Sequence, residues 1–260
     1  MTVPALFTVS EKPAAELAGA DNVLFLGNAL GTDTHLWDLA LPTLAAKFSV
    51  VRFDMPGHGQ SPVPADSYTL EEIADALVAK ADELGVEKFD YAGVSVSGAI
   101  ALELANKYLE RIKHSIVVCS AAYMGGPEGW EERIAQVSNS GTASLIPALP
   151  ARWFSDDFIA KDSGAVQKTL AMVVATDDAS YIKTCEALGN YDARPFLAEI
   201  TVPVLVISGE IDPGSPPAAG AFIAETVPGA QQVVIPGASH IAVVETPLEM
   251  AKHITDFLAK

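Results

Sequence analysis

One serine in the sequence lies in a pattern that can turn its hydroxyl into a nucleophile. Residues 93–98 read Gly-Val-Ser-Val-Ser-Gly and directly follow a short apolar run that ends at Ala92. A serine at a sharp, glycine-rich turn from a strand to a helix is exposed at the end of the strand, in the arrangement called a nucleophile elbow. The usual pattern is G-x-S-x-G, whereas here Ser97 takes the last position and Gly98 follows it. We predict Ser95 as a nucleophile; the alternative is a chance Gly/Ser-rich turn.

A serine nucleophile needs a general base, and the base needs an acid that orients it. The apolar runs that begin at Val204 and Gln232 each end in a polar loop, which contains Asp212 after the first run and His240 after the second. Serine, acid and histidine follow one another along the chain in this order when they meet at one edge of a parallel sheet. We therefore predict Asp212 as the acid and His240 as the base. Glu210 is the competing acid, and Asp212 is preferred because a residue two positions further along reaches over the strand end.

Acyl transfer through a serine forms an oxyanion, which two backbone N–H groups can stabilise. The amide of Val96, directly after the predicted nucleophile, is one such donor. The loop at residues 27–32, after the apolar run at 23–26, is the expected source of the second. We predict the amide of Leu30 as that donor, since the backbone and not the side chain carries the chemistry.

The other reactive side chains are interpreted as structural. Cys119 and Cys185 are too few for a disulfide framework or a Cys-rich zinc site, and we expect buried residues rather than catalytic thiols. His58 is interpreted as a loop residue. His35 lies close to the loop at 27–32 and stays a candidate for the pocket. No metal and no organic cofactor are predicted.

The elements that position these residues alternate between short apolar runs and helical patterns. Residues 70–84 carry apolar side chains at helical spacing, and residues 97–108 and 246–258 are similar. Alternating strands and helices favour an α/β fold with a mostly parallel sheet. Buried strands are predicted at 23–26, 49–53, 89–92, 115–119, 204–208 and 232–235.

The alternation breaks once, between Cys119 and Val204. Helical patterns fill this interval, and Asp177 or Asp178 is a plausible N-cap for the last of them. We predict a core domain of residues 1–120 and 200–260, with a helical cap subdomain of residues 121–199 inserted over one end of the sheet. The expected cap helices are 129–137, 155–161, 165–175 and 179–188.

The composition limits what the chain can bind. Lys and Arg sum to 16 against 33 Asp and Glu, so the formal net charge is −17. This balance argues against nucleic acid and against anionic membrane surfaces as partners. Neither a signal peptide nor an apolar stretch of about 20 residues is found, so a soluble, cytoplasmic protein is expected. An anionic small substrate would be repelled at long range unless the site has its own cation. Nothing in the sequence indicates an oligomeric state.

Several segments resemble the 3-oxoadipate enol-lactonases of aromatic-compound catabolism, within the α/β-hydrolase fold. Residues 28–33 read Asn-Ala-Leu-Gly-Thr-Asp and are followed by Trp37, similar to that family's Asn-Ser-Leu-Gly-Thr-Asp and Trp. Residues 130–134 and 151–154 resemble its Trp-x-x-Arg-Ile and Ala-Arg-Trp-Phe. Ser97 in place of Gly, and Met-Pro at 55–56 in place of Thr-Arg, depart from the pattern.

The resemblance covers nearly the whole chain and implies both a fold and a reaction. The fold is the α/β-hydrolase fold, with an N-terminal strand pair and a helical cap inserted after the sixth strand. The reaction is the hydrolysis of 3-oxoadipate enol-lactone to 3-oxoadipate through an acyl-enzyme on Ser95, without a cofactor. The expected partner is a small, anionic substrate.

A cap residue could hold the substrate carboxylate. On a helical wheel, Arg133 shares the apolar face with Trp130 and Val137, whereas Glu131 and Glu132 point elsewhere. An arginine on the face that looks down on the site can bind a carboxylate with two hydrogen bonds.

Other interpretations of the cap remain open. Arg133 could instead extend its guanidinium into water or pair with a cap acid such as Asp156 or Asp157, and Arg152 is the rival cation. Trp130 and Trp153 could line the pocket or only pack.

Other activities fit the same three residues. A general carboxylesterase, a carbon–carbon bond hydrolase and a cofactor-free perhydrolase are alternatives, and so is a ligand-binding protein without turnover. Dehalogenases and epoxide hydrolases are disfavoured because their nucleophile at this turn is Asp rather than Ser.

Overall fold

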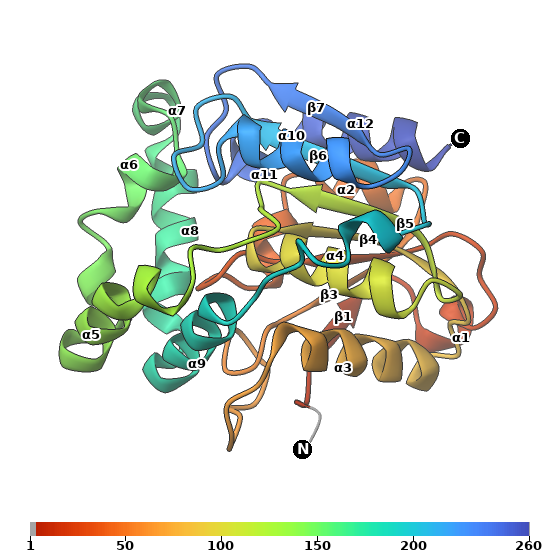
Figure 1. The fold of residues 1–260 in the computed structure, drawn as a ribbon, viewed down its shortest axis with the longest axis horizontal. Helices are drawn as coiled ribbons and strands as arrows, with labels where there is room; N and C mark the ends of the chain where they lie inside the picture. Colours follow the sequence, from red (N-terminus) through yellow and green to blue (C-terminus); the bar gives the residue numbers. More distant parts are fainter. Residues whose placement is uncertain (1–3, 260) are drawn as a thin grey trace.

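A seven-stranded sheet forms the centre of the computed structural model, which describes residues 4–259 (Figure 1). The strands lie in the order β1-β3-β2-β4-β5-β6-β7, and only β1 runs antiparallel to its neighbour. The predicted α/β fold with a mostly parallel sheet is confirmed. The strands are β1 (Thr8–Ser10), β2 (Val23–Gly27), β3 (Ser49–Phe53), β4 (Phe89–Val94), β5 (Ile112–Val118), β6 (Val204–Gly209) and β7 (Gln231–Ile235).

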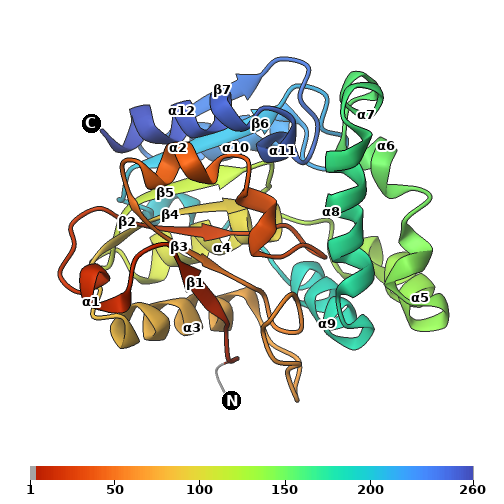
Figure 2. The same cartoon turned by 180° about the vertical axis from the view of Figure 1, so that it is seen from behind.

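Helices cover both faces of this sheet. Helices α4 and α10 lie in front of the sheet in Figure 1, and α2 and α12 lie in front of it in Figure 2, which is the opposite view. Every residue of β2, β4 and β6 is buried, as expected for central parallel strands covered on both sides. The helices outside the segment between β5 and β6 are α1 (Ala14–Leu17), α2 (Leu41–Ala45), α3 (Leu70–Glu83), α4 (Val96–Lys107), α10 (Pro217–Thr226), α11 (Ala242–Glu245) and α12 (Pro247–Leu258), with the 3-10 turn η1 (Thr34–Trp37).

The register of the sheet brings several strand ends to one edge. Gly27 of β2 lies beside Gly93 of β4, and Gly209 of β6 lies beside Ile235 of β7. The loops that follow these strands therefore begin close together in space. These loops hold the residues predicted from the sequence to do chemistry.

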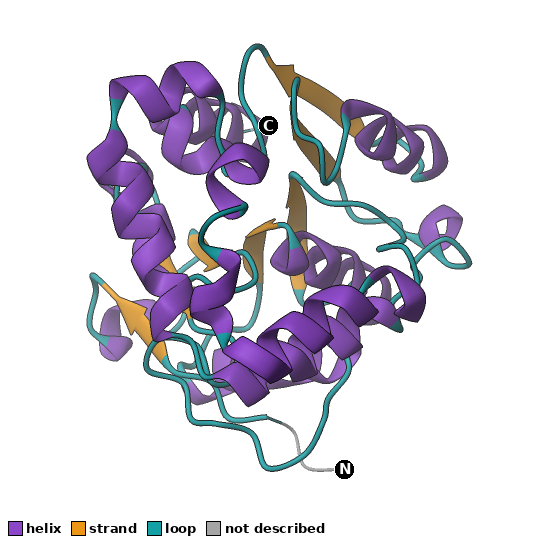
Figure 3. Ribbon diagram, turned by 90° about the vertical axis from the view of Figure 1, so that its left-hand side faces the viewer, coloured by secondary structure: helices purple, strands orange, loops and turns teal. Residues whose placement is uncertain are grey.

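The segment between β5 and β6 is helical and stands over this edge. These helices face the viewer in Figure 3. Ser155, Asp162 and Asp177 each accept a hydrogen bond from a backbone N–H in the first turn of the helix that follows, which fixes where those helices begin. The elements are η2 (Pro127–Gly129), α5 (Glu131–Ser140), η3 (Thr142–Leu145), α6 (Leu149–Trp153), α7 (Asp156–Lys161), α8 (Ser163–Ala175), α9 (Asp178–Gly189) and η4 (Leu197–Glu199).

The place of this helical insertion differs from the prediction by one strand. It follows β5, the fifth strand of the described chain, and not a sixth strand. The expected N-terminal strand pair is a single strand in residues 4–22, since helix α1 begins directly after Pro13. Among the residues that the structure describes, no helix is long and apolar enough to cross a membrane.

Candidate active site

The turn at Ser95 joins β4 directly to α4 in a strained conformation. Ser95 lies between the last residue of β4, Val94, and the first of α4, Val96, with φ 57° and ψ −114°. A positive φ is uncommon for a residue with a side chain and clusters at functional turns. The helix also approaches its surroundings closely, because a Cβ added at Gly98 would lie 2.5 Å from the Cβ of Ser120. The turn therefore has the geometry of a nucleophile elbow.

The three residues predicted from strand ends meet at this edge of the sheet. The Nε2 atom of His240 lies 3.0 Å from the Oγ atom of Ser95, and its Nδ1 atom lies 2.8 Å from Oδ2 of Asp212. Asp212 follows β6 and His240 follows β7. With a proton on Nδ1 facing the carboxylate, Nε2 is free to accept the proton of the serine hydroxyl.

Asp212 is buried in an environment that keeps it charged. Its exposed fraction is 2%, and the backbone N–H groups of Gly214 and Ser215 donate to Oδ1 over 2.8 and 3.0 Å. Burial alone raises the pKa of this carboxyl, but the hydrogen bond with His240 and the two backbone donors outweigh it, so the pKa is lowered from its ordinary value. The competing acid, Glu210, is exposed and accepts from the N–H of Gly237 instead.

Two backbone amides beside Ser95 have no acceptor in the described part of the chain. Val96 is the first residue of α4, where helix N–H groups lack an intrahelical partner. Leu30 lies in the loop after β2 and lines the same cavity as Ser95. Neither amide donates a hydrogen bond within residues 4–259. Both are therefore available to an oxyanion formed at Ser95.

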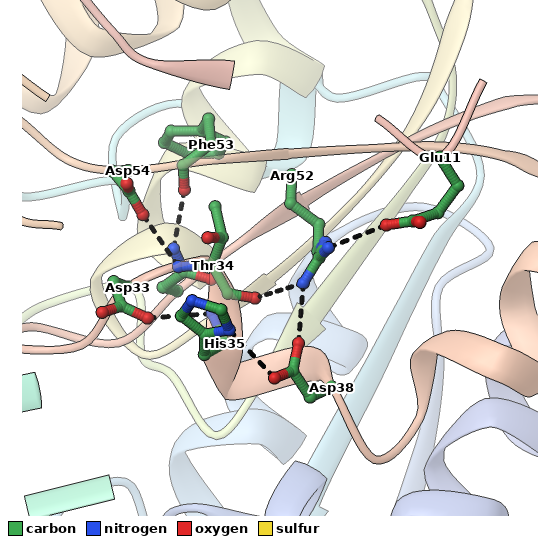
Figure 4. Close-up of polar contacts among 9 residues, drawn as sticks. Glu11, Asp33, Thr34, His35, Asp38, Arg52, Phe53 and Asp54 are labelled. Atoms are coloured by element: carbon green, nitrogen blue, oxygen red, sulfur yellow. Dashed lines mark hydrogen bonds and ion pairs between the residues drawn. The ribbon is translucent and has the colours of Figure 1, made fainter. Parts of the chain in front are cut away.

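A network of charged side chains anchors the turn that continues this loop. Arg52, which is 7% exposed, donates to the carbonyl of Thr34 over 2.9 Å and also contacts Asp38 and Glu11 (Figure 4). The carboxylate of Asp54 accepts from the N–H of Thr34 over 2.8 Å. The loop after β2 is thus fixed to the end of β3.

His35 belongs to this network and not to the site. Its ring points toward the carboxylate of Asp38 (Figure 4). The two groups lie 2.9 Å apart, and the side chain of His35 is 64% exposed. It does not line the cavity that contains Ser95. The interpretation of His35 as a pocket candidate is wrong for that site, because the 3-10 turn η1 directs the ring outward.

The cavity above Ser95 is formed by the insertion between β5 and β6. It has a volume of about 570 Å³ and contains Ser95, His240 and Leu30 together with residues of η2, α5 and α6. The four residues predicted to contact substrate all line it, namely Trp130, Arg133, Arg152 and Trp153. Glu132 lines it too, so the prediction that both cap glutamates point elsewhere is wrong for this residue, which is exposed.

The two arginines of the cavity lack acidic partners in the described chain. Arg133 is half-buried, with its guanidinium 5.6 Å from the ring centre of Trp130, and Arg152 is exposed. Neither forms an ion pair within residues 4–259, so the alternative pairing of Arg133 with Asp156 or Asp157 is not found. Both guanidinium groups are available to an anion in the cavity.

The carboxylate of Glu245, whose role was not predicted from the sequence, joins the helical insertion to the loop of His240. Glu245 accepts from the N–H and the hydroxyl of Ser155, both over 2.7 Å, and from the N–H of Ser239. The N–H of Ile241 donates to the carbonyl of Trp153 over 2.9 Å. Only the spacing of five residues after His240 marks Glu245 in the sequence. Its partner Ser155 is 90 residues away.

The remaining reactive side chains are buried. Burial raises the pKa of the Cys119 thiol and raises that of Cys185 to about 12, so neither is a ready thiolate. Burial lowers the pKa of His58 to about 4, and its Nδ1 atom lies 3.0 Å from the carbonyl of Pro56. Within residues 4–259 no group of three His, Cys, Asp or Glu side chains is arranged to hold a metal ion.

Known proteins with the same architecture include lactone and ester hydrolases. A family model described as alpha/beta hydrolase fold matches residues 22–247. The 3-oxoadipate enol-lactonase 1 of Acinetobacter baylyi is 32% identical over 94% of this chain and 92% of its own, and enol-lactonase 2 of that organism is 33% identical over 86% and 84%. The crystal structure of an enol-lactonase from Burkholderia xenovorans superposes with a TM-score of 0.93 at 31% identity, covering 98% of this chain and 96% of the other.

Proposed function

We propose that this chain, which belongs to the alpha/beta hydrolase family, opens a small enol-lactone that carries a carboxylate, with 3-oxoadipate enol-lactone as its substrate and 3-oxoadipate as its product. It is a hydrolytic enzyme for esters or lactones. The preference for an anionic substrate rests on one observation: two arginines without acidic partners in the described chain line the cavity that contains Ser95 and His240. The names of the relatives support the same substrate.

In the proposed mechanism His240 removes the proton of the Ser95 hydroxyl, and Oγ attacks the lactone carbonyl. The amides of Val96 and Leu30 donate to the oxyanion of the tetrahedral intermediate. The ring C–O bond then breaks, and His240 gives its proton to the enolate that leaves, which stays attached through the acyl chain. A water molecule deprotonated by His240 releases the product from Ser95, while Asp212 holds the imidazole in the required tautomer.

The charge of the chain makes the local cations necessary. A formal net charge of −17 repels an anion at long range. Inside the cavity, a guanidinium beside a carboxylate acts over a few ångströms and with less screening by water. Arg133 is the better-placed of the two, because it is half-buried and held over Trp130.

Other hydrolases share this fold at lower similarity. Proteins named putative carbamate hydrolase and pimeloyl-[acyl-carrier protein] methyl ester esterase are 26% identical to the chain. A carboxylesterase, a carbon–carbon bond hydrolase and a perhydrolase would use the same three residues. A binding protein without turnover would not need the aligned hydroxyl, imidazole and carboxylate.

Replacing Arg133 with alanine should separate anionic from neutral substrates. We expect kcat/KM for the anionic enol-lactone to fall by about 10- to 100-fold, mainly through KM, since a hydrogen bond to a charged group contributes about 1.5–3 kcal/mol. Hydrolysis of p-nitrophenyl acetate should change little. Arg133→Lys should lie between the two, because lysine keeps the charge and loses the paired hydrogen bonds.

Arg194→Ala is the matched control. This exposed arginine lies over the ring of Tyr123, which also lines the cavity, but its guanidinium is already paired with Asp192. Its removal should leave both substrates nearly unaffected. Equal losses of Arg133→Ala on the lactone and on the neutral ester would overturn the carboxylate-binding role.

A further inference from the structure

Ser97 is the residue that departs from the usual G-x-S-x-G pattern, and its side chain has a specific contact. It is fully buried in the first turn of α4, and its hydroxyl donates to the carbonyl of Asn28 over 2.6 Å. Asn28 lies in the loop after β2, two residues before Leu30. The bond therefore joins the helix that follows the nucleophile to the loop that supplies the second oxyanion donor.

We propose that Ser97 is a positioning residue for the oxyanion site: its hydroxyl sets the distance between the amides of Leu30 and Val96. This role rests on the proposed function of Ser95 as nucleophile. Ser97 does not touch the substrate. It acts by fixing two segments that come from distant parts of the sequence.

Asn28 is held from both sides in the structure. Its carbonyl accepts from no other donor within residues 4–259, so the hydroxyl of Ser97 is its hydrogen-bond partner there. Its side-chain amide donates to the carbonyl of Phe53, at the end of β3, over 2.6 Å. Without the hydroxyl of Ser97, the loop would lose its hydrogen bond to α4. It would keep the hydrogen bond from the side chain of Asn28 to the carbonyl of Phe53.

The close approach of β2 to α4 explains why a serine can make this bond. A Cβ added at Gly27 would lie 2.6 Å from the Cβ of Ser97 and 2.5 Å from the hydroxyl oxygen of Tyr91. Glycine at position 27 lets the strand end lie against the helix, and the short side chain of Ser97 then reaches the next carbonyl along the loop. Alanine at position 97 keeps the Cβ and its packing and removes only the hydroxyl.

A displaced oxyanion donor affects the tetrahedral state more than the bound substrate. Removing one donor outright lowers kcat by about 10²–10³-fold in a serine hydrolase. A Leu30 amide that is held less firmly should lower kcat by a smaller factor, about 10-fold, and should change KM by less than about twofold. A general loss of stability would instead lower the melting temperature without weakening the affinity of the folded enzyme for a tetrahedral adduct.

The test compares Ser97→Ala and Ser97→Gly with Ser115→Ala. The hydroxyl of Ser115 is also buried and also donates to a backbone carbonyl of α4, that of Ala101, over 2.9 Å. Ser115 is at the start of the pairing between β5 and β6, away from the carboxyl edge of the sheet. For each variant we would measure kcat and KM on p-nitrophenyl acetate, the affinity for phenylboronic acid, which forms a tetrahedral adduct with a nucleophilic serine, and the melting temperature.

We expect kcat and the affinity for phenylboronic acid to fall by similar factors in both Ser97 variants. In Ser115→Ala we expect only the melting temperature to fall. Wild-type kcat and affinity in either folded Ser97 variant, or losses matched by Ser115→Ala, would overturn the positioning role. If Ser97→Ala does not fold, Ser97→Gly serves as the test, because glycine also lacks the hydroxyl. A wild-type protein that hydrolyses neither lactones nor esters would instead refute the proposed function itself.

Discussion

Ser95→Ala is expected to lower kcat by about 10⁶-fold, on any lactone or ester that the wild-type protein hydrolyses. The hydroxyl of Ser95 is the attacking atom in the proposed mechanism, and no other hydroxyl lies within hydrogen-bond distance of Nε2 of His240 in the described chain. The amides of Val96 and Leu30 would remain and leave a small residual rate. The measurement is a steady-state assay with an activated ester and with the enol-lactone.

The same variant should keep its fold and its binding site. Alanine retains the Cβ, so the backbone strain at φ 57° is unchanged. Calorimetric titration with the product, 3-oxoadipate, should give an affinity within a few fold of the wild-type value, since the arginines are untouched. Turnover that survives in Ser95→Ala would remove Ser95 as the nucleophile.

Asp212→Asn is expected to lower kcat by about 10⁴-fold with KM nearly unchanged. The carboxylate accepts from Nδ1 of His240, whereas an amide can offer an N–H there and favour the wrong tautomer of the ring. Glu210→Gln is the matched control, because Glu210 is the competing acid and its carboxylate accepts from the N–H of Gly237. Activity lost equally in both variants would contradict the assignment of Asp212.

The lowered pKa of Asp212 also predicts how the stability of this variant depends on pH. The folded pKa lies below the ordinary value of 3.8, so the folded state favours the charged carboxylate. This contribution to stability is present above the unfolded pKa and is lost as the pH falls through the folded pKa. Asp212→Asn should therefore lower the melting temperature more at pH 7 than at pH 3. A difference in melting temperature that does not depend on pH would contradict this.

The meeting of Ser95, Asp212 and His240 could be predicted from the sequence because each lies just after a strand. A strand end can be recognised from the local sequence, and the carboxyl ends of parallel strands lie at the same edge of the sheet. The inward position of Arg133 followed from helical periodicity in the same way. The fold class and these contacts needed no knowledge of long-range packing.

The contacts that could not be predicted involve residues that no motif in the sequence pairs with one another. The bond from Ser97 to Asn28 spans 69 residues and that from Ser155 to Glu245 spans 90. Nothing in the local patterns around them specifies a partner. The outward direction of His35 was also not predicted, and it accompanies a contact with Asp38, which the buried Arg52 holds in place.

Binding of a substrate carboxylate in the cavity is tested by comparing two substrates that differ in one charge. We would determine kcat/KM of the wild-type protein for 3-oxoadipate enol-lactone and for the methyl ester of its carboxylate. We expect the free acid to be preferred by about 10- to 100-fold, as for a carboxylate hydrogen-bonded to an arginine. An ester hydrolysed as well as the acid or better, or an enol-lactone that is not opened at all, would contradict this expectation.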